Sequence, residues 1–168
     1  DINKKNVLLE KEIDTEEIIK KRKKFVLFFL IWICLLGCGL LRKTLQNDTF
    51  YTIKIGELIL DNGIDMMDHF SFHENLAYTY PHWLYDVFIY LIYSVGGQTG
   101  IYISTVILCM VLGILMYITN VKLTKNNVTS FIITIGAIYL LKDYIAARAQ
   151  LVTFILFLLT VYCIEQFL

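Results

Sequence analysis

Asp48 is the first residue whose type and position could do chemistry. It closely follows an apolar stretch at residues 25–41 and opens a segment rich in acids. A carboxylate held beside a reacting hydroxyl can act as a general base. A carboxylate at the start of a helix can instead accept backbone N–H bonds and complement the helix dipole. Both interpretations of Asp48, general base and helix cap, stay open at this point.

All three histidines, His69, His73 and His82, lie in the same acidic segment. His69, His73 and Asp68 carry imidazole and carboxylate groups, which suit a divalent metal ion. The spacing of His69 and His73 fits one face of a helix, whereas Phe70-Ser71-Phe72 between them is typical of extended chain, and there is no HExxH motif. A metal site at these three residues is therefore one hypothesis, and ordinary loop histidines are the other.

Arg148 is a single guanidinium in the short sequence Ala146–Gln150, between two apolar runs. Such a cation at a membrane boundary either extends its charge to water or binds an anion. Lys142 and Asp143 lie close enough in sequence to pair with each other. We therefore expect Arg148 to have no acidic partner, and both interpretations, snorkelling and anion binding, stay open.

Composition indicates what kind of protein positions these residues. Apolar residues make up 57% of the 168-residue chain, which has one proline, and the mean hydropathy is +0.62. Long apolar runs separated by polar segments predict an all-α, polytopic helical membrane protein. The cysteines all fall in predicted spans without CxxC spacing, so we expect small apolar core residues and neither disulfides nor a zinc site. They are Cys34, Cys38, Cys109 and Cys163.

Four segments are predicted to cross a hydrocarbon core that is about 30 Å thick. A block of five basic residues at 20–24 precedes the first span, which predicts a charged cytoplasmic leader at residues 1–24 and a multi-pass protein of the plasma membrane. The position of this block favours membrane orientation over binding of nucleic acid. The leader itself is expected to be an amphipathic surface helix or a solvated tail. The predicted spans are residues 25–41, 101–119, 128–141 and 151–168.

Residues 42–100 are predicted to form one large external loop with two helices along the membrane surface. The first, at residues 48–62, has a stripe of side chains at helical spacing. The second, at residues 82–95, begins with Pro81 and has too short an apolar run for an ordinary span. It also contains Asp86, which would cost about 3 kcal/mol at the bilayer centre. The stripe on the first helix consists of Tyr51, Ile55, Leu58, Ile59 and Asn62.

The order of these elements resembles the GT-C superfamily of membrane glycosyltransferases, which includes protein mannosyltransferases and the aminoarabinose transferases of lipid A. The resemblance covers residues 25–168 and implies the N-terminal part of such an enzyme. It departs from the family pattern at Thr49, where many members have a second acid, and in having one proline before the second surface helix. The motifs that carry it are Asn47-Asp48-Thr-Phe-Tyr51, Leu60-Asp-Asn-Gly63, the aromatic helix that Pro81 begins, and Gly96-Gly97. The chain also resembles a related group of bacterial membrane proteins. That resemblance is carried by Asp48 with Gly56, Ile59, Leu60 and Gly63, then by Asp68, Phe70 and Ser71, and then by His82, Trp83 and Leu84.

The resemblance implies a sugar donor linked to polyprenyl phosphate and an acceptor reached from the outer membrane face. Asp48 would be the general base, and Arg148 would neutralise the departing phosphate. Asp143 and His82 would bind substrate, and a divalent metal ion held by the loop residues could assist. The alternative is a non-enzymatic polytopic protein, such as a transporter or a subunit of an envelope-assembly complex. Residues 101–119 contain no charge, which favours an external site over a conduction path.

Overall fold

The chain folds into five helices in the residues that the structure describes. The computed structural model describes residues 2–40, 45–73 and 76–167. The predicted all-α fold class is confirmed over these residues, where Met67 and Ala77 form an isolated antiparallel bridge in the α2–α3 loop. The helices are α1 (Ile2–Leu40), α2 (Asn47–Asn62), α3 (Trp83–Thr124), α4 (Asn127–Leu141) and α5 (Ala149–Phe167).

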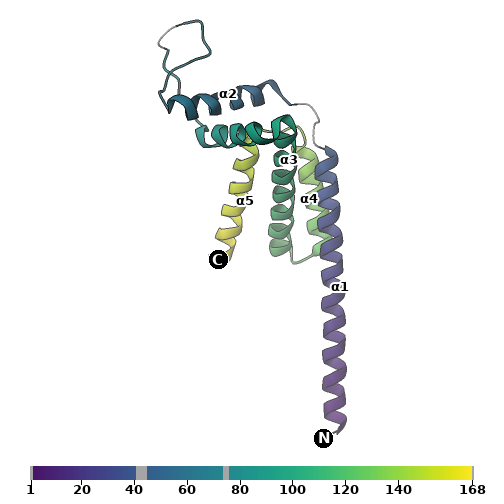
Figure 1. The fold of residues 1–168 in the computed structure, drawn as a ribbon. Coiled ribbons are helices and arrows are strands. Elements are labelled where there is room, and N and C mark those ends of the chain that lie inside the picture. Colours follow the sequence, from purple (N-terminus) through teal and green to yellow (C-terminus); the bar gives the residue numbers. More distant parts are fainter. Residues whose placement is uncertain (1, 41–44, 74–75, 168) are drawn as a thin grey trace.

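The helices form an upright bundle with a crosswise layer at one end (Figure 1). The later part of α3 stands beside α1, α4 and α5, with the axes roughly aligned. α2 and the beginning of α3 lie across the end of this bundle that is far from the N-terminus. The predicted surface helices at 48–62 and 82–95 therefore correspond to the crosswise layer, and the predicted spans correspond to the upright bundle.

A sharp bend at Gly97 divides α3 into two legs, residues 83–96 and residues 98–124. Gly97 has φ 56° and ψ −149°, a conformation that residues with a Cβ rarely adopt. The first leg lies across the end of the bundle and the second leg stands within it (Figure 1). Because of the bend at Gly97, one continuous apolar sequence contributes a helix to the crosswise layer and another to the upright bundle.

Two helices, α3 and α5, are long and apolar enough to cross a membrane, while α4 is a shorter apolar helix of 15 residues. The predicted spans 101–119, 128–141 and 151–168 fall in α3, α4 and α5. The predicted span 25–41 falls in α1 as far as Leu40. Residues 41–44, 74–75 and 168, which belong to the predicted first span, external loop and last span, lie outside the described residues.

The charged leader and the first apolar segment are parts of one helix. α1 runs without interruption from Ile2 to Leu40, and Figure 1 shows it extending well beyond the other helices toward the N-terminus. The backbone therefore forms neither the separate surface helix nor the frayed tail that was expected for residues 2–24. Helix-favouring lysines and glutamates continue the helical pattern across the basic block at 20–24.

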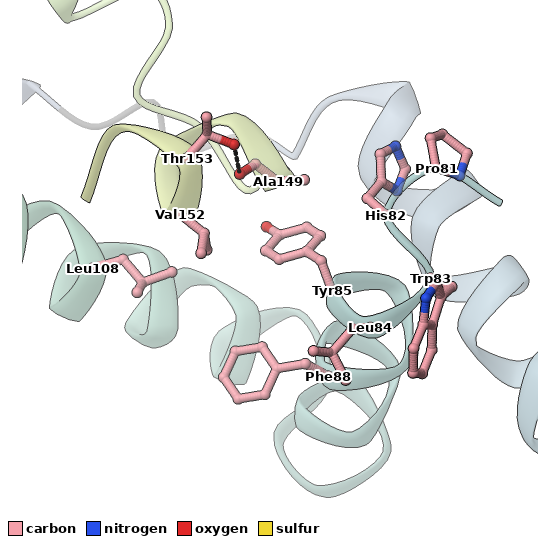
Figure 2. A pocket seen from close by; sticks show the side chains of 10 residues that line it. All are labelled: Pro81, His82, Trp83, Leu84, Tyr85, Phe88, Leu108, Ala149, Val152 and Thr153. Carbon is pink, nitrogen blue, oxygen red and sulfur yellow. Dashed lines mark hydrogen bonds between the residues drawn. The ribbon is translucent and has the colours of Figure 1, made fainter. Parts of the chain in front are cut away.

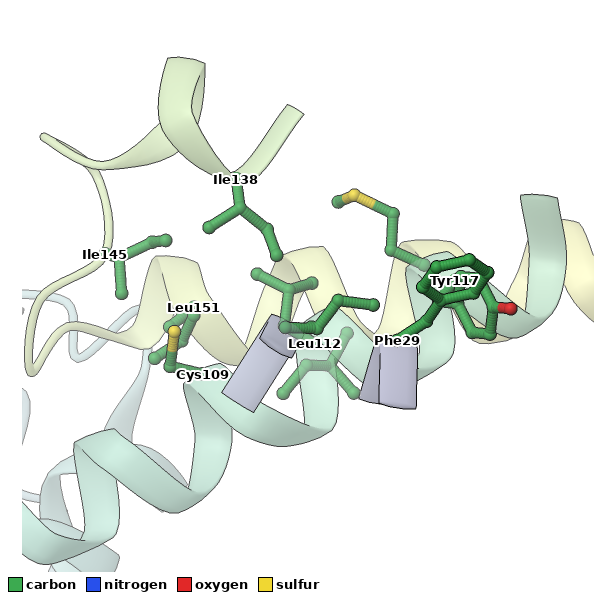
Figure 3. Close-up of a cluster of buried hydrophobic side chains, with 10 residues drawn as sticks. Phe29, Cys109, Leu112, Tyr117, Ile138, Ile145 and Leu151 are labelled. Carbon is green, nitrogen blue, oxygen red and sulfur yellow. The ribbon is translucent and has the colours of Figure 1, made fainter. Parts of the chain in front are cut away.

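The bundle is held together by a hydrophobic cluster to which α1, α3, α4 and α5 all contribute (Figure 3). Phe29 of α1 stacks on Phe131 of α4 at a ring-centroid distance of 4.5 Å, and it meets Tyr117 of α3 edge-on. This cluster fixes where α5 begins, because Leu151 is buried in it. The other buried members are Ile33, Cys109, Leu112, Met116, Ile138, Ile145 and Ile155.

The two crosswise helices pack with their backbones in close approach. A Cβ added at Gly56 of α2 would lie 2.2 Å from the backbone oxygen of Asp86 in α3. The predicted stripe on α2 is consequently only partly correct, since Ile55 and Ile59 are buried but Tyr51 is exposed, as is Asn62. The contact between α2 and α3 includes small residues such as Gly56, which a pattern of large apolar side chains does not predict. The buried residues of α2 are Thr49, Thr52, Ile53, Ile55, Gly56 and Ile59.

Candidate functional site

Asp48 and Arg148 form an ion pair across the end of the bundle. Nη2 of Arg148 donates to Oδ2 of Asp48 at 2.5 Å. The prediction that Arg148 has no acidic partner is therefore wrong. The two residues are 100 positions apart in sequence, and it is the folding of α2 against the segment before α5 that brings them together. Both side chains stay accessible, with exposed fractions of 65% for Asp48 and 42% for Arg148.

A buried hydrogen bond beside the ion pair fixes the position of α2. Oγ1 of Thr49 donates to the backbone oxygen of Ala147 at 3.3 Å, and Thr49 is almost completely buried. Adjacent residues of α2 thus contact adjacent residues of the α4–α5 connection. Thr49 is therefore a structural contact that holds its neighbour Asp48 next to Arg148.

The carboxylate of Asp48 does not cap the helix that it begins. Gln46 is at the N-cap position and no side chain makes a capping hydrogen bond there. Asp48 lies in the first turn, where its charge still complements the helix dipole. The prediction that Asp48 caps the helix by accepting backbone N–H bonds is therefore wrong, because its carboxylate accepts a hydrogen bond from Arg148.

Arg148 has donors that the ion pair does not use. Its Nε is buried and, among the residues the structure describes, has no hydrogen-bond partner. A guanidinium presents five N–H donors in a fixed planar arrangement. Since 42% of the Arg148 side chain is exposed, the accessible part of the guanidinium has capacity for a further acceptor beside Asp48, which a tetrahedral or planar oxyanion would match.

Figure 2 shows an apolar pocket of about 670 Å³. It lies between the start of α3, the second leg of α3 and the first turns of α5. Ala149, which lines it, directly follows Arg148, so the pocket and the ion pair are neighbours. In Figure 2 the ring of Tyr85 lies between α3 and the start of α5. The lining residues are Pro81, His82, Trp83, Leu84, Tyr85, Phe88, Leu108, Ala149, Val152 and Thr153.

His82, predicted to bind substrate, lies on the wall of this pocket and pairs with Asp86. Nδ1 of His82 is 2.8 Å from Oδ1 and 3.0 Å from Oδ2 of Asp86. Burial raises the pKa of Asp86, and the neighbouring His82 opposes that shift. Asp86 was not among the predicted site residues, although the His-x-x-x-Asp spacing after Pro81 is a signal that predicts this pair.

A second polar cluster, centred on Asp65, organises the loop between α2 and α3. Its carboxylate accepts from the backbone N–H of Met67 and from the hydroxyl of Tyr80, each at 3.1 Å, and lies 2.6 Å from Nε2 of His69. The Met67 N–H, then His69, and to a smaller extent Tyr80 lower the pKa of Asp65. Burial, followed by the hydrogen bond to Asp65, raises the pKa of Tyr80.

The predicted metal ligands do not converge in the described part of the chain. Oδ1 of Asp68 accepts the backbone N–H groups of Phe70 and Ser71, at 2.9 and 3.3 Å. His69 pairs with Asp65, while the backbone N–H of His73 donates to Oγ of Ser71. Over residues 2–40, 45–73 and 76–167, no group of three or more His, Cys, Asp or Glu side chains could hold a metal ion.

The structure thus places the predicted residues in four locations. Asp48 and Arg148 form one pair, His82 lies in the adjoining pocket, and His69, His73 and Asp68 belong to the distant loop. Asp143 is exposed in the turn between α4 and α5, before Arg148. No family model, curated protein or solved structure matches this chain.

Proposed function

We propose that the chain belongs to a membrane glycosyltransferase that moves a sugar from a polyprenyl-phosphate donor to an acceptor at the outer face of the plasma membrane. The observation that carries this proposal is the Asp48–Arg148 ion pair beside the apolar pocket. A carboxylate, a guanidinium with spare donors and an apolar pocket together match the acceptor hydroxyl, phosphate and hydrocarbon chain of this reaction.

The proposed arrangement is polytopic with a cytoplasmic N-terminus, and the distribution of basic residues in the sequence supports it. The basic block at 20–24 and Lys122 with Lys125 lie toward the same side in the predicted topology, which is the cytoplasmic side. The crosswise layer and the connection containing Arg148 lie together at the opposite end of the bundle (Figure 1). In the proposed orientation the ion pair lies at the outer membrane face, where a lipid-linked donor would present its phosphate.

Arg148 is proposed to bind the donor phosphate. Its planar donors suit two phosphate oxygens at once, and its buried Nε has no partner among the described residues. The donor phosphate would compete with Asp48 for the guanidinium. Donor binding would therefore free the Asp48 carboxylate for catalysis.

The pocket is proposed to hold the first part of the polyprenyl chain. Its lining is mostly apolar, and it begins one residue after the cation that would hold the phosphate. A lipid phosphate has this same order of groups, with charge directly followed by hydrocarbon. Arg148 and the apolar pocket are therefore complementary to the phosphate and the hydrocarbon chain of a single lipid ligand.

Asp48 is proposed to accept the proton of the acceptor hydroxyl. As the proton moves to the carboxylate, the acceptor oxygen forms a bond to the anomeric carbon of the sugar. The bond from that carbon to the phosphate oxygen breaks, and its electron pair leaves with the polyprenyl phosphate bound to Arg148. General-base catalysis of this kind contributes about 10²–10⁴-fold to a rate.

The test is sugar transfer by the full-length protein reconstituted in lipid vesicles with radiolabelled polyprenyl-phosphate sugars. We expect transfer by the wild type and a loss of at least about 100-fold in Asp48→Asn, because the amide cannot accept the proton. Lys54→Gln is the matched control on the same helix, since it removes only an exposed pair with Glu57. Equal activity of Asp48→Asn and wild type would refute the base assignment. Absence of transfer with every donor, together with a lower thermal stability of Asp48→Asn, would support a purely structural ion pair.

A further inference from the structure

Asp86 is an unusual charged residue for its position in the fold. Within the described ranges it is the one charged side chain that is completely buried. It lies beneath α2, where Gly56 meets its backbone oxygen. Burying a carboxylate is costly unless hydrogen bonds compensate for the lost water. The compensation comes from His82, one turn earlier.

The distances in this contact fit a proton on Nδ1 of His82. Both oxygens of Asp86 lie within 3.0 Å of Nδ1 of His82. An ionised carboxylate has two acceptor oxygens, so an Nδ1–H shared between them fits these distances. In the neutral imidazole that has its proton on Nδ1, Nε2 carries a lone pair and accepts hydrogen bonds.

Unlike Asp86, His82 is accessible. The exposed fraction of its side chain is 41%, against 1% for Asp86, and His82 lines the pocket that begins beside Arg148. The hydroxyl of Thr153 in the same pocket donates to the backbone oxygen of Ala149. His82 therefore brings a side-chain acceptor to a wall that is otherwise mainly apolar.

We propose that Asp86 is a positioning residue that holds His82 with Nδ1 protonated, so that Nε2 accepts a hydrogen bond from a sugar hydroxyl of an amphiphile whose hydrocarbon chain occupies the pocket. The sugar class of the ligand rests on the proposed glycosyl transfer, whereas the pairing and the pocket position of His82 do not. If the His82–Asp86 pair only stabilised the start of α3, the imidazole of His82 would not need to be accessible.

The first measurement is the protonation state of His82 in the full chain, labelled with ¹⁵N-histidine and reconstituted in nanodiscs at pH 8. The signal that disappears in His82→Gln identifies the residue. We expect a protonated Nδ1 and an unprotonated Nε2 in the wild type. Asp86→Leu removes the carboxylate. Asp86→Asn has the same shape as the wild-type side chain and serves as a second variant in case Asp86→Leu does not fold. Both variants should give a mixture of His82 tautomers. Ile89→Ala, which disturbs the buried face of the same helix, should leave the wild-type tautomer.

The second measurement is the response of Nε2 to an amphiphile with hydroxyl groups. Dodecyl maltoside should shift the Nε2 resonance of His82, whereas dodecylphosphocholine, which has no hydroxyl group, should not. Apparent affinity for the maltoside should fall about fivefold in Asp86→Leu, the loss expected for one hydrogen bond of about 1 kcal/mol. A protonated Nε2 in the wild type, an unchanged tautomer in both Asp86 variants, or equal shifts with both amphiphiles would overturn the proposal. If these results hold and no sugar is transferred, the binding role of His82 stands and the proposed reaction fails.

Discussion

At the residue scale, the contact between Asp48 and Arg148 matters more for the chemistry it permits than for stability. Both side chains are accessible, and exposed ion pairs contribute about 0–1 kcal/mol to folding. The neighbouring bond from Thr49 to Ala147 is buried and already holds the two segments together. The ion pair can therefore open for a ligand without unfolding the crosswise layer.

Arg148→Lys tests whether sugar transfer needs the planar shape of the guanidinium in addition to its positive charge. Lysine keeps the positive charge but lacks the planar donors that bind two phosphate oxygens. We expect sugar transfer to fall by at least about tenfold, because one well-placed donor to a developing oxyanion is worth that much or more. Thermal melting in detergent should differ little from the wild type. Full activity of Arg148→Lys would show that the planar donors are not used.

The sequence predicts residues of this site better than it predicts their contacts. Asp48 and Arg148 were identified by their type and by their places beside apolar runs. Their pairing was not, because it joins positions 100 apart and depends on how two helices pack. The His82–Asp86 pair was predictable in principle from local spacing, whereas the burial of Asp86 depends on the glycine in α2.

At the element scale, the crosswise layer depends on Gly56. The close approach of α2 to the first leg of α3 leaves no space for a side chain, since a Cβ would lie 2.7 Å from Cβ of Tyr90 as well as close to the Asp86 backbone. Backbone atoms cannot move aside as the end of a flexible side chain can. The position of Asp48 relative to Arg148 therefore depends on this glycine.

Gly56→Ala should lower the free energy of unfolding by about 1–3 kcal/mol, the usual cost of forcing extra volume into a packed contact. Gly136→Ala is the matched control, because it places the same methyl group on a helix with nothing within 4 Å. The control should be neutral or slightly stabilising, owing to the better helix propensity of alanine. Chemical unfolding in mixed micelles measures both. Equal stability of the two variants would contradict the close packing of α2 on α3.

The loop between α2 and α3 should lose its order in acid. Hydrogen bonds from Met67, His69 and Tyr80 lower the pKa of Asp65 below its ordinary value of 3.8. Because the pKa of Asp65 is lower in the folded state, its ionised carboxylate stabilises the folded loop at pH values above 3.8. This stabilisation is lost as the pH falls through the folded-state pKa of Asp65. Protection of the Met67 amide against hydrogen exchange should therefore decrease in that range. In Asp65→Asn the protection should be low at all pH values, and a wild type without pH dependence would rule out this role of Asp65.

At the scale of the whole molecule, the apolar runs were enough to predict an all-helical chain, with bundle and surface helices at close to their observed positions. The bend at Gly97 was less evident, because the apolar sequence continues through it and the structure has one interrupted helix where two were expected. The continuity of α1 was also missed. Both features depend on local backbone geometry, to which hydropathy is insensitive.

Cysteine labelling tests the orientation of the bundle. Single cysteines at Gln98 and Asn126, in a background without Cys34, Cys38, Cys109 and Cys163, should differ in their reaction with an impermeant maleimide on intact cells. Gln98 directly follows the bend at Gly97, next to the crosswise layer, and should be labelled, whereas Asn126 lies in the α3–α4 turn and should react only after the membrane is opened. The reverse result would place the ion pair on the cytoplasmic side.

The central claim is that Asp48 and Arg148 act on substrate and are not merely paired with each other. The charge-swapped double variant Asp48→Arg with Arg148→Asp tests it most directly, because the swap preserves an ion pair while reversing both proposed roles. We predict a thermal stability within about 1 kcal/mol of the wild type, as expected for an exposed pair, and no detectable sugar transfer in the reconstituted assay. Restoration of transfer by the swap, above the level of either single variant, would contradict the claim and show that the pair is structural.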